Sequence, residues 1–405
     1  MGKVSGKPSF AFNECAHDRS PVPAHGLTFV IRTDAAFATA KIRQNILDHI
    51  ESDPHHPLHG KPDLENCITR ITHGAYEIWG HEVLSAKAEC LDYTRYNLQE
   101  PKDKSLHVHF YNAHALTTRA IEMAEKMLAE SAAHKPGVPT MFISLDDMIQ
   151  KQRDPWADIG FSRLFDHQGK EHFGYIGRPG MKPLDTQIKE AKSQLEALSR
   201  QHGCKIPFVL LEDNVRHARM LNWVIDMLDQ QDFFAHADLA AISTCFCCAP
   251  EQEREAIKHD GKTVPLAIVI DYEQNLVDVC TPRDLMLDGF VVEVNGRVTR
   301  LPGIFADMIE RFKINPNKVD HFNKQVIDSN IEFCRTLECA FRLDLPVSWF
   351  KGADAIEYIH GIPAQTRMVD VMEHLRLSIP VPKASNGNDN ASPVPASPAH
   401  KPKSP

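Results

Sequence analysis

The chain has 405 residues, 42% of them hydrophobic and 24% charged, which is typical of a globular protein long enough for two domains. Its 45 basic and 54 acidic residues give a net charge of −9 with histidine neutral. That charge argues against a protein-wide surface for nucleic acid or anionic membranes. No apolar stretch reaches the length of a membrane span, and the first residues lack the hydrophobic core of a signal peptide.

The ten cysteines do not form the dense framework of a disulfide-rich protein. Several lie inside apolar runs, which favours reduced thiols and a cytoplasmic protein. Cys245, Cys247 and Cys248 are soft metal ligands, but no second pair of cysteines or histidines follows at zinc spacing. On a strand Cys248 would also face away from the other two thiols. We therefore expect buried, small hydrophobic side chains and no structural zinc.

The first part of the chain, residues 27–170, alternates predicted strands and helices behind a polar, flexible arm of residues 1–26. The proline and glycine content of residues 53–62 predicts a loop. The mixed pattern of residues 67–97 assigns neither a helix nor a strand to them. A helix is expected to begin at Asp146 or Asp147. The predicted strands are residues 26–32, 106–111 and 140–145, and the predicted helices are residues 34–50 and 115–130.

The middle of the chain, residues 171–302, is the expected α/β core. Three apolar strands alternate with helices, which predicts a mainly parallel sheet with helices on both faces. Asn295-Gly296 between two alternating runs predicts a β-hairpin inserted at residues 290–301. The other elements expected here are a loop at residues 173–183, helices at 185–201 and 251–259, and strands at 206–211, 239–246 and 264–271.

The last part of the chain is predicted to be helical as far as residue 379 and disordered beyond it. Residues 303–379 contain expected helices at 304–312, 318–343 and 366–375. Residues 380–405 consist mainly of Pro, Ser, Ala and Asn with almost no apolar bulk, which is typical of a disordered tail.

One unit, residues 204–231, is the predicted functional centre, since α/β folds bind ligands at the carboxyl ends of their strands. A buried strand ends in Glu212, Asp213 and Asn214, and Asp213 or Asn214 is expected to cap the helix that follows. Arg216 and the basic residues after it oppose the helix dipole, which favours an anion at the helix start. The alternative is that these cations are solvated and pair with nearby carboxylates.

The apolar strand, the acid pair Glu212-Asp213 and the short loop that opens a helix resemble the ribose-phosphate motif of type I phosphoribosyltransferases. The resemblance spans roughly residues 173–271. In that family two acidic residues bind the ribose hydroxyls, and a loop rich in Thr and Gly wraps the 5-phosphate. The resemblance implies catalytic roles for Glu212 and Asp213, a Mg²⁺ cofactor, and a phosphorylated small molecule, a nucleotide or ribose phosphate, as ligand.

The phosphate loop of this chain departs from that family. Arg216, His217, Ala218 and Arg219 stand where the family has small and hydroxyl residues, which puts transfer chemistry in doubt. Their place at a helix start, rather than the resemblance, predicts that Arg216, His217 and Arg219 bind phosphate. A relative that keeps the fold and binds a different phosphate fits equally well. The sequence predicts neither an oligomeric state nor a nucleic-acid partner.

The second resemblance is to the receiver domains of response regulators, whose first strand also ends in an acid pair. Asp271, which ends the strand at 264–271, would be the phosphoacceptor, although its separation of 58 positions from Asp213 exceeds the usual gap. A domain of this kind would be regulatory, or a nucleotide sensor, without turnover. Both resemblances imply Mg²⁺ near strand-end carboxylates, here Asp213 and Asp271.

Three further groups of residues are candidates for the same edge of the sheet or for a metal. Arg178, in the loop before residues 185–201, is expected to contact phosphate, with Lys182 assisting, because such loops often close over ligands. Arg283 and Asp284 follow the third strand and either line the pocket or pair with each other. The clustered histidines are expected to be a solvated face rather than ligands; they are His55, His56, His59, His107, His109 and His114.

Overall fold

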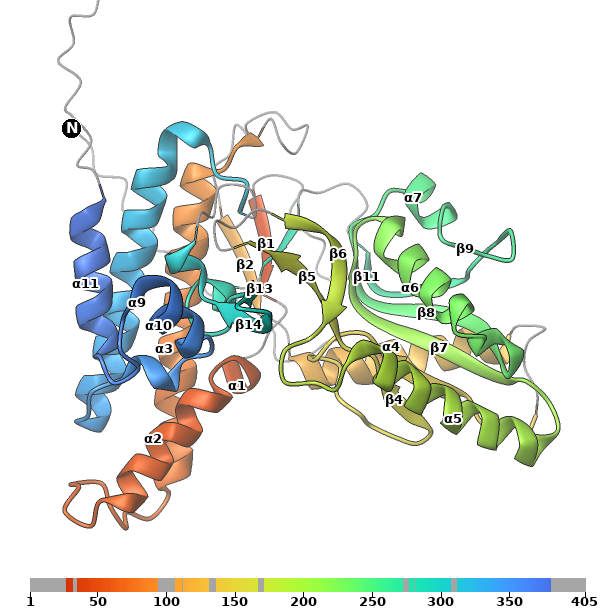
Figure 1. The fold of residues 1–405 in the computed structure, drawn as a ribbon, viewed down its shortest axis with the longest axis horizontal. Coiled ribbons are helices and arrows are strands. Elements are labelled where there is room, and N and C mark those ends of the chain that lie inside the picture. The colour runs from red at the N-terminus through yellow and green to blue at the C-terminus, as the bar shows by residue number, and fades with distance from the viewer. Residues whose placement is uncertain are drawn as a thin grey trace, which may run out of the picture.

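The computed structural model describes residues 27–31, 35–93, 106–110, 112–130, 136–166, 171–271, 277–280, 282–306 and 312–379. It is an α/β protein, as the sequence predicts. Figure 1 shows two units beside each other. We call residues 113–271 the sheet unit, and we call residues 35–93 with 285–379 the helical unit. The expected arm, residues 1–26, and the tail, residues 380–405, lie outside the described residues.

The sheet unit is built on five parallel strands in the order β11-β8-β7-β3-β4. The central strand is β7, and its residues 206–213 are all buried. An unbroken apolar run forms such a strand because both of its faces are covered. The strands are β3 (Met141–Ser144), β4 (Trp156–Asp158), β7 (Ile206–Val215), β8 (Ala237–Cys247) and β11 (Leu266–Asp271).

Helices cover both faces of this sheet. Phe208 and Leu210 point to the face packed by α5 (Leu184–His202) and α6 (Ala218–Gln230). Val209 and Leu211 belong to the core on the other face, beneath α4 (Ala113–Ala129). The alternation follows from the two-residue period of a strand. The connection from β8 to β11 contains α7 (Glu251–Glu255) and the small hairpin β9 (Lys258–His259) and β10 (Lys262–Thr263).

Two smaller sheets accompany the main one. A mixed sheet has the order β14-β13-β5-β6, and a parallel sheet has the order β12-β1-β2. The predicted hairpin is confirmed, because Asn295 and Gly296 both have positive φ values, 52° and 71°, as its tight turn requires. The strands are β1 (Leu27–Ile31), β2 (Leu106–Phe110), β5 (Phe161–Phe165), β6 (Glu171–Gly177), β12 (Val277–Cys280), β13 (Phe290–Val294) and β14 (Arg297–Leu301).

The helical unit joins residues from both ends of the chain in one core. Trp79 on α3 packs against Phe333 on α9, and its indole N–H donates to Asn330 at 2.6 Å. This core combines residues from 35–90 and 285–372 with Phe165, whereas the expected division was into consecutive regions 27–170, 171–302 and 303–379. The helices are α1 (Ala35–Ala38), α2 (Ala40–Ser52), α3 (Leu64–Cys90), α9 (Val319–Phe341), α10 (Ala353–His360) and α11 (Met368–Ser378).

Several local predictions were wrong. No helix begins at Asp146 or Asp147; Asp146 instead accepts a hydrogen bond from the backbone N–H of Met148 at 2.9 Å, closing a turn that leads to β4 and β5. Residues 171–177 are the strand β6 rather than part of a loop. The helix expected over 251–259 is only α7, and the short 3₁₀ helix Gly303–Phe305 stands at the start of the one expected over 304–312.

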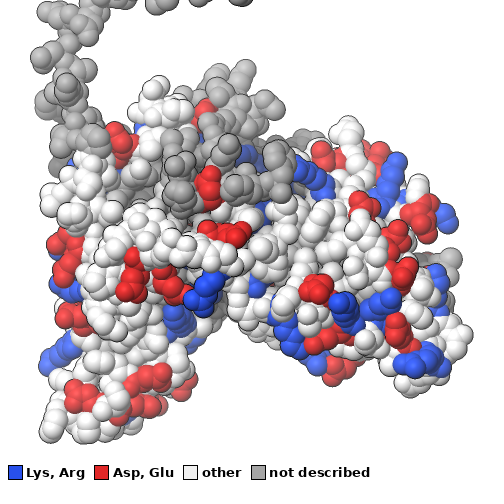
Figure 2. Space-filling model, viewed as in Figure 1, with Lys and Arg blue, Asp and Glu red and all other residues white. Residues whose placement is uncertain are grey.

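Side chains of neither charge dominate the visible surface of the protein (Figure 2). On the face shown in Figure 2, acidic and basic side chains are interspersed over both units. Among the described residues, no helix has both the length and the apolar character needed to span a membrane.

Candidate functional site

The strand order of the main sheet reverses between β3 and β7. After β3 the chain adds β4 on one side, and after β7 it adds β8 and then β11 on the other side. Neighbouring connections therefore leave in opposite directions at the carboxyl ends of β3 and β7, the arrangement that in open α/β sheets forms a crevice. Ligands of open α/β sheets bind at such a switch point. We call this place the switch-point crevice.

Two pairs of acidic residues flank the switch-point crevice. Glu212 and Asp213, near the carboxyl end of β7, are 6% and 2% exposed. The end of β3 lies directly beside them, because the N–H of Leu145 donates to the carbonyl of Leu211 at 2.9 Å. Asp146 and Asp147 are the next two residues of the chain after Leu145. Two of the four acids were predicted as site residues, and the fold brings the second pair to the same edge of the sheet.

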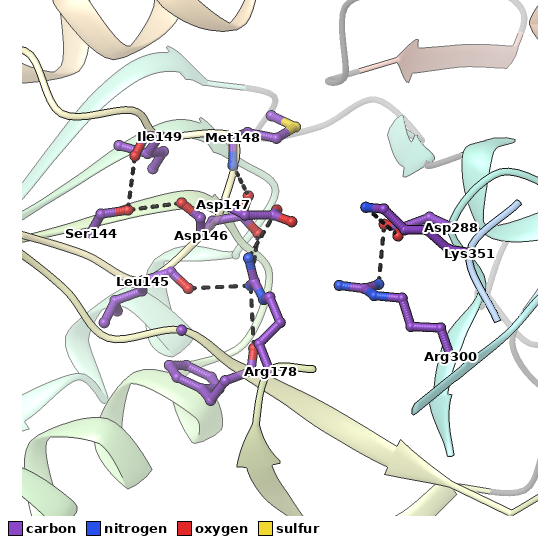
Figure 3. A network of polar contacts seen from close by, with 12 residues as sticks. Ser144, Leu145, Asp146, Asp147, Met148, Ile149, Arg178, Asp288, Arg300 and Lys351 are labelled. Carbon is purple, nitrogen blue, oxygen red and sulfur yellow. Dashed lines mark hydrogen bonds and ion pairs between the residues drawn. The ribbon is translucent and has the colours of Figure 1, made fainter. Parts of the chain in front are cut away.

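Arg178 is buried against the second acid pair. Its guanidinium lies 2.9 Å from Oδ1 of Asp147 and 3.6 Å from Oδ2 of Asp146. It also donates to the carbonyls of Leu145 (3.5 Å) and Phe161 (3.2 Å), as Figure 3 shows for the Leu145 contact. Arg178 was predicted to contact phosphate from a flexible loop. In this structure it is a fixed cation at the end of β6 that neutralises part of the charge of Asp146 and Asp147.

Gln187 on α5 holds this edge of the sheet in place. Its amide accepts from the N–H of Gly160 at 2.7 Å and donates to the carbonyls of Gly160 (3.3 Å) and Lys182 (2.6 Å). Gly160 also accepts the backbone N–H of Arg178 at 3.1 Å. A side chain at position 160 would collide with Met181, since an added Cβ would lie 2.0 Å from its sulfur. Gln187 therefore positions Arg178 through Gly160.

The start of α6 differs from the prediction. Asp213 and Asn214 do not cap this helix, because β7 continues as far as Val215 and His217 is the N-cap residue, without a capping hydrogen bond from its side chain. The first helical N–H, of Ala218, instead donates to Oε2 of Glu253 at 2.9 Å. A carboxylate from α7 thus already accepts the first N–H of the helix end at which phosphate was expected.

The predicted phosphate ligands around α6 are largely on the surface. His217 and Arg219 are exposed and Arg216 is half-buried. The ring Nδ1 of His217 lies 3.8 Å from Oε1 of Glu253. Lys182 is also exposed and pairs with Glu190 at 2.6 Å. The switch-point crevice and the start of α6 are therefore chemically different places, the first mainly acidic and the second basic around one carboxylate.

The two predicted metal ligands, Asp213 and Asp271, lie on strands separated by β8. Asp271 is engaged by Arg254 through two hydrogen bonds of 2.6 and 2.7 Å. Among the described residues, no three His, Cys, Asp or Glu side chains are grouped closely enough to hold a metal on their own. Mg²⁺ usually takes only one or two carboxylates and completes its shell with water and phosphate oxygens, so Glu212 and Asp213 fit a metal that arrives with its ligand.

The remaining candidates are described only in part. Asp284 is buried, and the side chain of Arg283 lies outside the described residues, as do those of His107 and His109. Cys245 and Cys247 are buried within β8 and Cys248 is half-buried. His56 is buried, with its Nε2 2.9 Å from the carbonyl of Phe341, so it has a structural contact rather than a solvated ring.

Sequence reasoning missed the roles of Asp146, Asp147 and Gln187. The pair Asp146-Asp147 directly follows a predicted strand, which is the same signal that singled out Glu212 and Asp213. Because this pair of aspartates was interpreted as the start of a helix, it was not assigned to the site. Gln187 carries no such signal, because its role depends on the path of Gly160, 27 positions earlier.

Comparisons with known proteins add a weak resemblance. No protein-family model matches the chain, and no curated protein matches it. Among solved structures, the chain is similar to a point mutant of the hypoxanthine phosphoribosyltransferase from Trypanosoma cruzi in complex with the product IMP. The sequences are 14% identical, the match covers 40% of this chain and 76% of the other, and the TM-score is 0.20.

Proposed function

We propose that this protein binds a phosphorylated small molecule, a nucleotide or a ribose phosphate, in the switch-point crevice. The observation that carries the proposal is that two acid pairs lie where the strand order reverses. A buried acid pair at this position suits the vicinal hydroxyls of a ribose or a Mg²⁺ ion, since carboxylates accept hydrogen bonds and are hard oxygen ligands. Glu212 and Asp213 take this role.

The basic residues at the start of α6 are the phosphate ligands that the sequence suggests. Arg216, His217 and Arg219 surround a helix start whose first N–H is bonded to Glu253. A phosphate there would have to displace that carboxylate or lie beside it. The phosphate and the carboxylate of Glu253 are both negative and repel each other at close range. Binding of phosphate at this helix start therefore costs free energy.

The same observation favours a second candidate function. A helix start closed by Glu253, in place of a loop of small and hydroxyl residues, lacks the open phosphate cradle that group transfer needs. A sensor domain that binds the ligand without turnover fits this arrangement. In the enzyme alternative, Mg²⁺ and the nearby cations would stabilise a pyrophosphate leaving group.

The test is calorimetric titration of nucleotides and ribose 5-phosphate, with and without Mg²⁺, against the wild type and Asp213→Asn. The substitution keeps the shape of the side chain and removes its charge, so we expect Mg²⁺-dependent binding to be lost. Binding that is indifferent to this change, or no binding at millimolar concentration, would contradict the proposal. Incubation with a ribose pyrophosphate donor separates the two functions, because released pyrophosphate indicates transfer chemistry and intact donor indicates a sensor.

A further inference from the structure

A second polar cluster, which we call the cationic cluster, lies in the helical unit and consists of Asp288, Arg300 and Lys351. The side chain of Asp288 is 2% exposed, and its carboxylate oxygens lie 3.1 Å from a guanidinium nitrogen of Arg300 and 2.9 Å from Nζ of Lys351. One carboxylate thus serves two cations, and the cluster keeps a net charge of +1. Asp288 is the sole ion-pair partner of both cations within the described part of the chain.

Two glycines fix the geometry of the cationic cluster. Gly289 follows Asp288 with φ of 81°, and an added Cβ would lie 2.3 Å from the carbonyl oxygen of Leu301. Gly352 follows Lys351 with φ of 84°, and an added Cβ would lie 2.2 Å from the carbonyl oxygen of Arg300. Both neighbouring segments therefore lie directly against the backbone of β14. A cluster held this closely presents its cations in a fixed position and spends little conformational entropy when an anion binds.

The register of the mixed sheet brings this cluster to the same edge as Arg178. β5 and β13 are parallel neighbours, with Leu164 opposite Val291. β6 is antiparallel to β5, with Gly177 opposite Phe161, and β14 is antiparallel to β13, with Leu301 opposite Phe290. The ends of β6 and β14 therefore lie beside the starts of β5 and β13.

The separation between the two groups follows from the strand order. Because β5 lies between β6 and β13, the backbones at Arg178 and Asp288 are about 10 Å apart by ordinary strand spacing. Only residues 159–160 separate β4 from β5. This edge of the mixed sheet thus continues the carboxyl edge of the main sheet, where the switch-point crevice lies.

The two groups of side chains face each other and differ in charge. In Figure 3, Arg300 and Lys351 extend toward the side of the view on which Asp147 and Arg178 lie, and the carboxylate of Asp147 points back toward them. Asp146, Asp147 and Arg178 carry a formal charge of −1, opposite to that of the cationic cluster. A phosphate with a bound metal ion matches this pattern, because the phosphate suits the basic side and the metal suits the acidic edge to which Glu212 and Asp213 also belong.

We infer that Arg300 and Lys351, held on Asp288, bind the phosphate group of the ligand whose ribose hydroxyls or metal ion lie at Glu212 and Asp213. The inference rests on the proposed function and deepens it, since it assigns the phosphate to the helical unit instead of the start of α6. Arg300 is 13% and Lys351 39% exposed at the side chain, so both are partly desolvated and still accessible. Partial desolvation strengthens a contact between a cation and a phosphate.

The experiment is calorimetric titration of inorganic pyrophosphate and of ribose 5-phosphate, at constant ionic strength and with Mg²⁺, against the full chain. Arg300→Gln and Lys351→Gln each leave Asp288 with one cation, so the fold is expected to persist with both. We expect each substitution to weaken binding of both probes about tenfold or more, as for a lost charge-assisted contact. The control is Lys189→Gln on α5, whose ammonium is 68% exposed beside Asp185 and whose loss should leave affinity unchanged.

The outcomes separate this inference from the proposed function. Pyrophosphate that fails to bind the wild type at millimolar concentration, or binds Arg300→Gln and Lys351→Gln as tightly as Lys189→Gln, overturns the inference. If ribose 5-phosphate binding falls with Asp213→Asn but not with Arg300→Gln or Lys351→Gln, the proposed function stands and the inference about the cationic cluster fails. If pyrophosphate binding depends on Arg300 and Lys351 while ribose phosphates and nucleotides do not bind, the cationic cluster is an anion site and the proposed function fails. Lower thermal stability with unchanged affinity would show a purely structural cluster.

Discussion

Replacing Arg178 by methionine should destabilise the sheet unit, because it removes a buried side chain that bridges the ends of β3 and β6. Methionine has a similar length and no charge. The substitution leaves Asp146 and Asp147 without this counter-ion and removes the donor to the carbonyls of Leu145 and Phe161.

The magnitude follows from the burial of the ion pair. Breaking a fully buried pair costs about 3–5 kcal/mol, since an uncompensated charge stays in the interior. The side chains of Arg178 and Asp146 are each 10% exposed, but that of Asp147 is 23% exposed and can regain some water. We therefore expect a loss of about 2–4 kcal/mol in the free energy of unfolding.

The assay is urea unfolding followed by circular dichroism and tryptophan fluorescence, with Arg153→Met as the matched control. Arg153 pairs with Glu125 and lies 4.9 Å from the ring of Phe142, but the paired side chains are 38% and 46% exposed. Its loss should cost about 1 kcal/mol or less. If Arg178→Met destabilises the protein no more than Arg153→Met does, then Arg178 does not hold the edge of the crevice together.

Two further predictions concern side chains outside the acid pairs. Gln187→Ala should cost about 1–3 kcal/mol in unfolding free energy, because it leaves the buried N–H of Gly160 without this acceptor, while the carbonyl of Gly160 keeps the N–H of Arg178. Urea unfolding measures this cost, and a value below about 0.5 kcal/mol would contradict the prediction. Iodoacetamide at neutral pH should alkylate exposed Cys339 before Cys90 and Cys334, as peptide mass spectrometry would show, because burial raises the pKa of Cys90 to about 11 and that of Cys334 well above its usual value.

Local patterns in the sequence predict the strands and helices whose signal is contained within them. The apolar run of β7 and the Asn295-Gly296 turn each specify their conformation without help from distant residues. Asp146-Asp147 could not be assigned in this way, because an aspartate after a strand suits a helix cap and a turn equally. The helix α3 has a mixed pattern because it packs in the common core with α2 and α9, so a single apolar stripe is not what the fold requires of it.

The candidate site is less predictable than the fold, because its residues come from distant parts of the chain. Glu212 and Asp213 are adjacent and follow an apolar strand, so one local pattern identifies both. Asp288 and Lys351 are 63 positions apart and meet only because two glycines allow their segments to lie against β14. No periodicity or motif connects them. Ion pairs of this kind depend on the packing of whole units, which local sequence patterns do not encode.

The position of Glu253 distinguishes between the two candidate phosphate sites, the start of α6 and the cationic cluster. Its carboxylate accepts the N–H of Ala218 and lies near His217, among the basic residues that the sequence assigns to phosphate. Glu253→Gln keeps an acceptor oxygen for that N–H and removes the negative charge.

If phosphate binds at the start of α6, this substitution removes a competing anion, and affinity should rise about fivefold, since a charge at a helix end is worth up to roughly 1 kcal/mol. If phosphate binds at the cationic cluster, Glu253→Gln should leave the affinity for ribose 5-phosphate and pyrophosphate unchanged. We expect the second result, because the start of α6 already has an anion and the cationic cluster carries a net positive charge. Calorimetric titration of Glu253→Gln and of Arg219→Gln decides between them. A gain with the first variant and a loss with the second would move the phosphate to the start of α6.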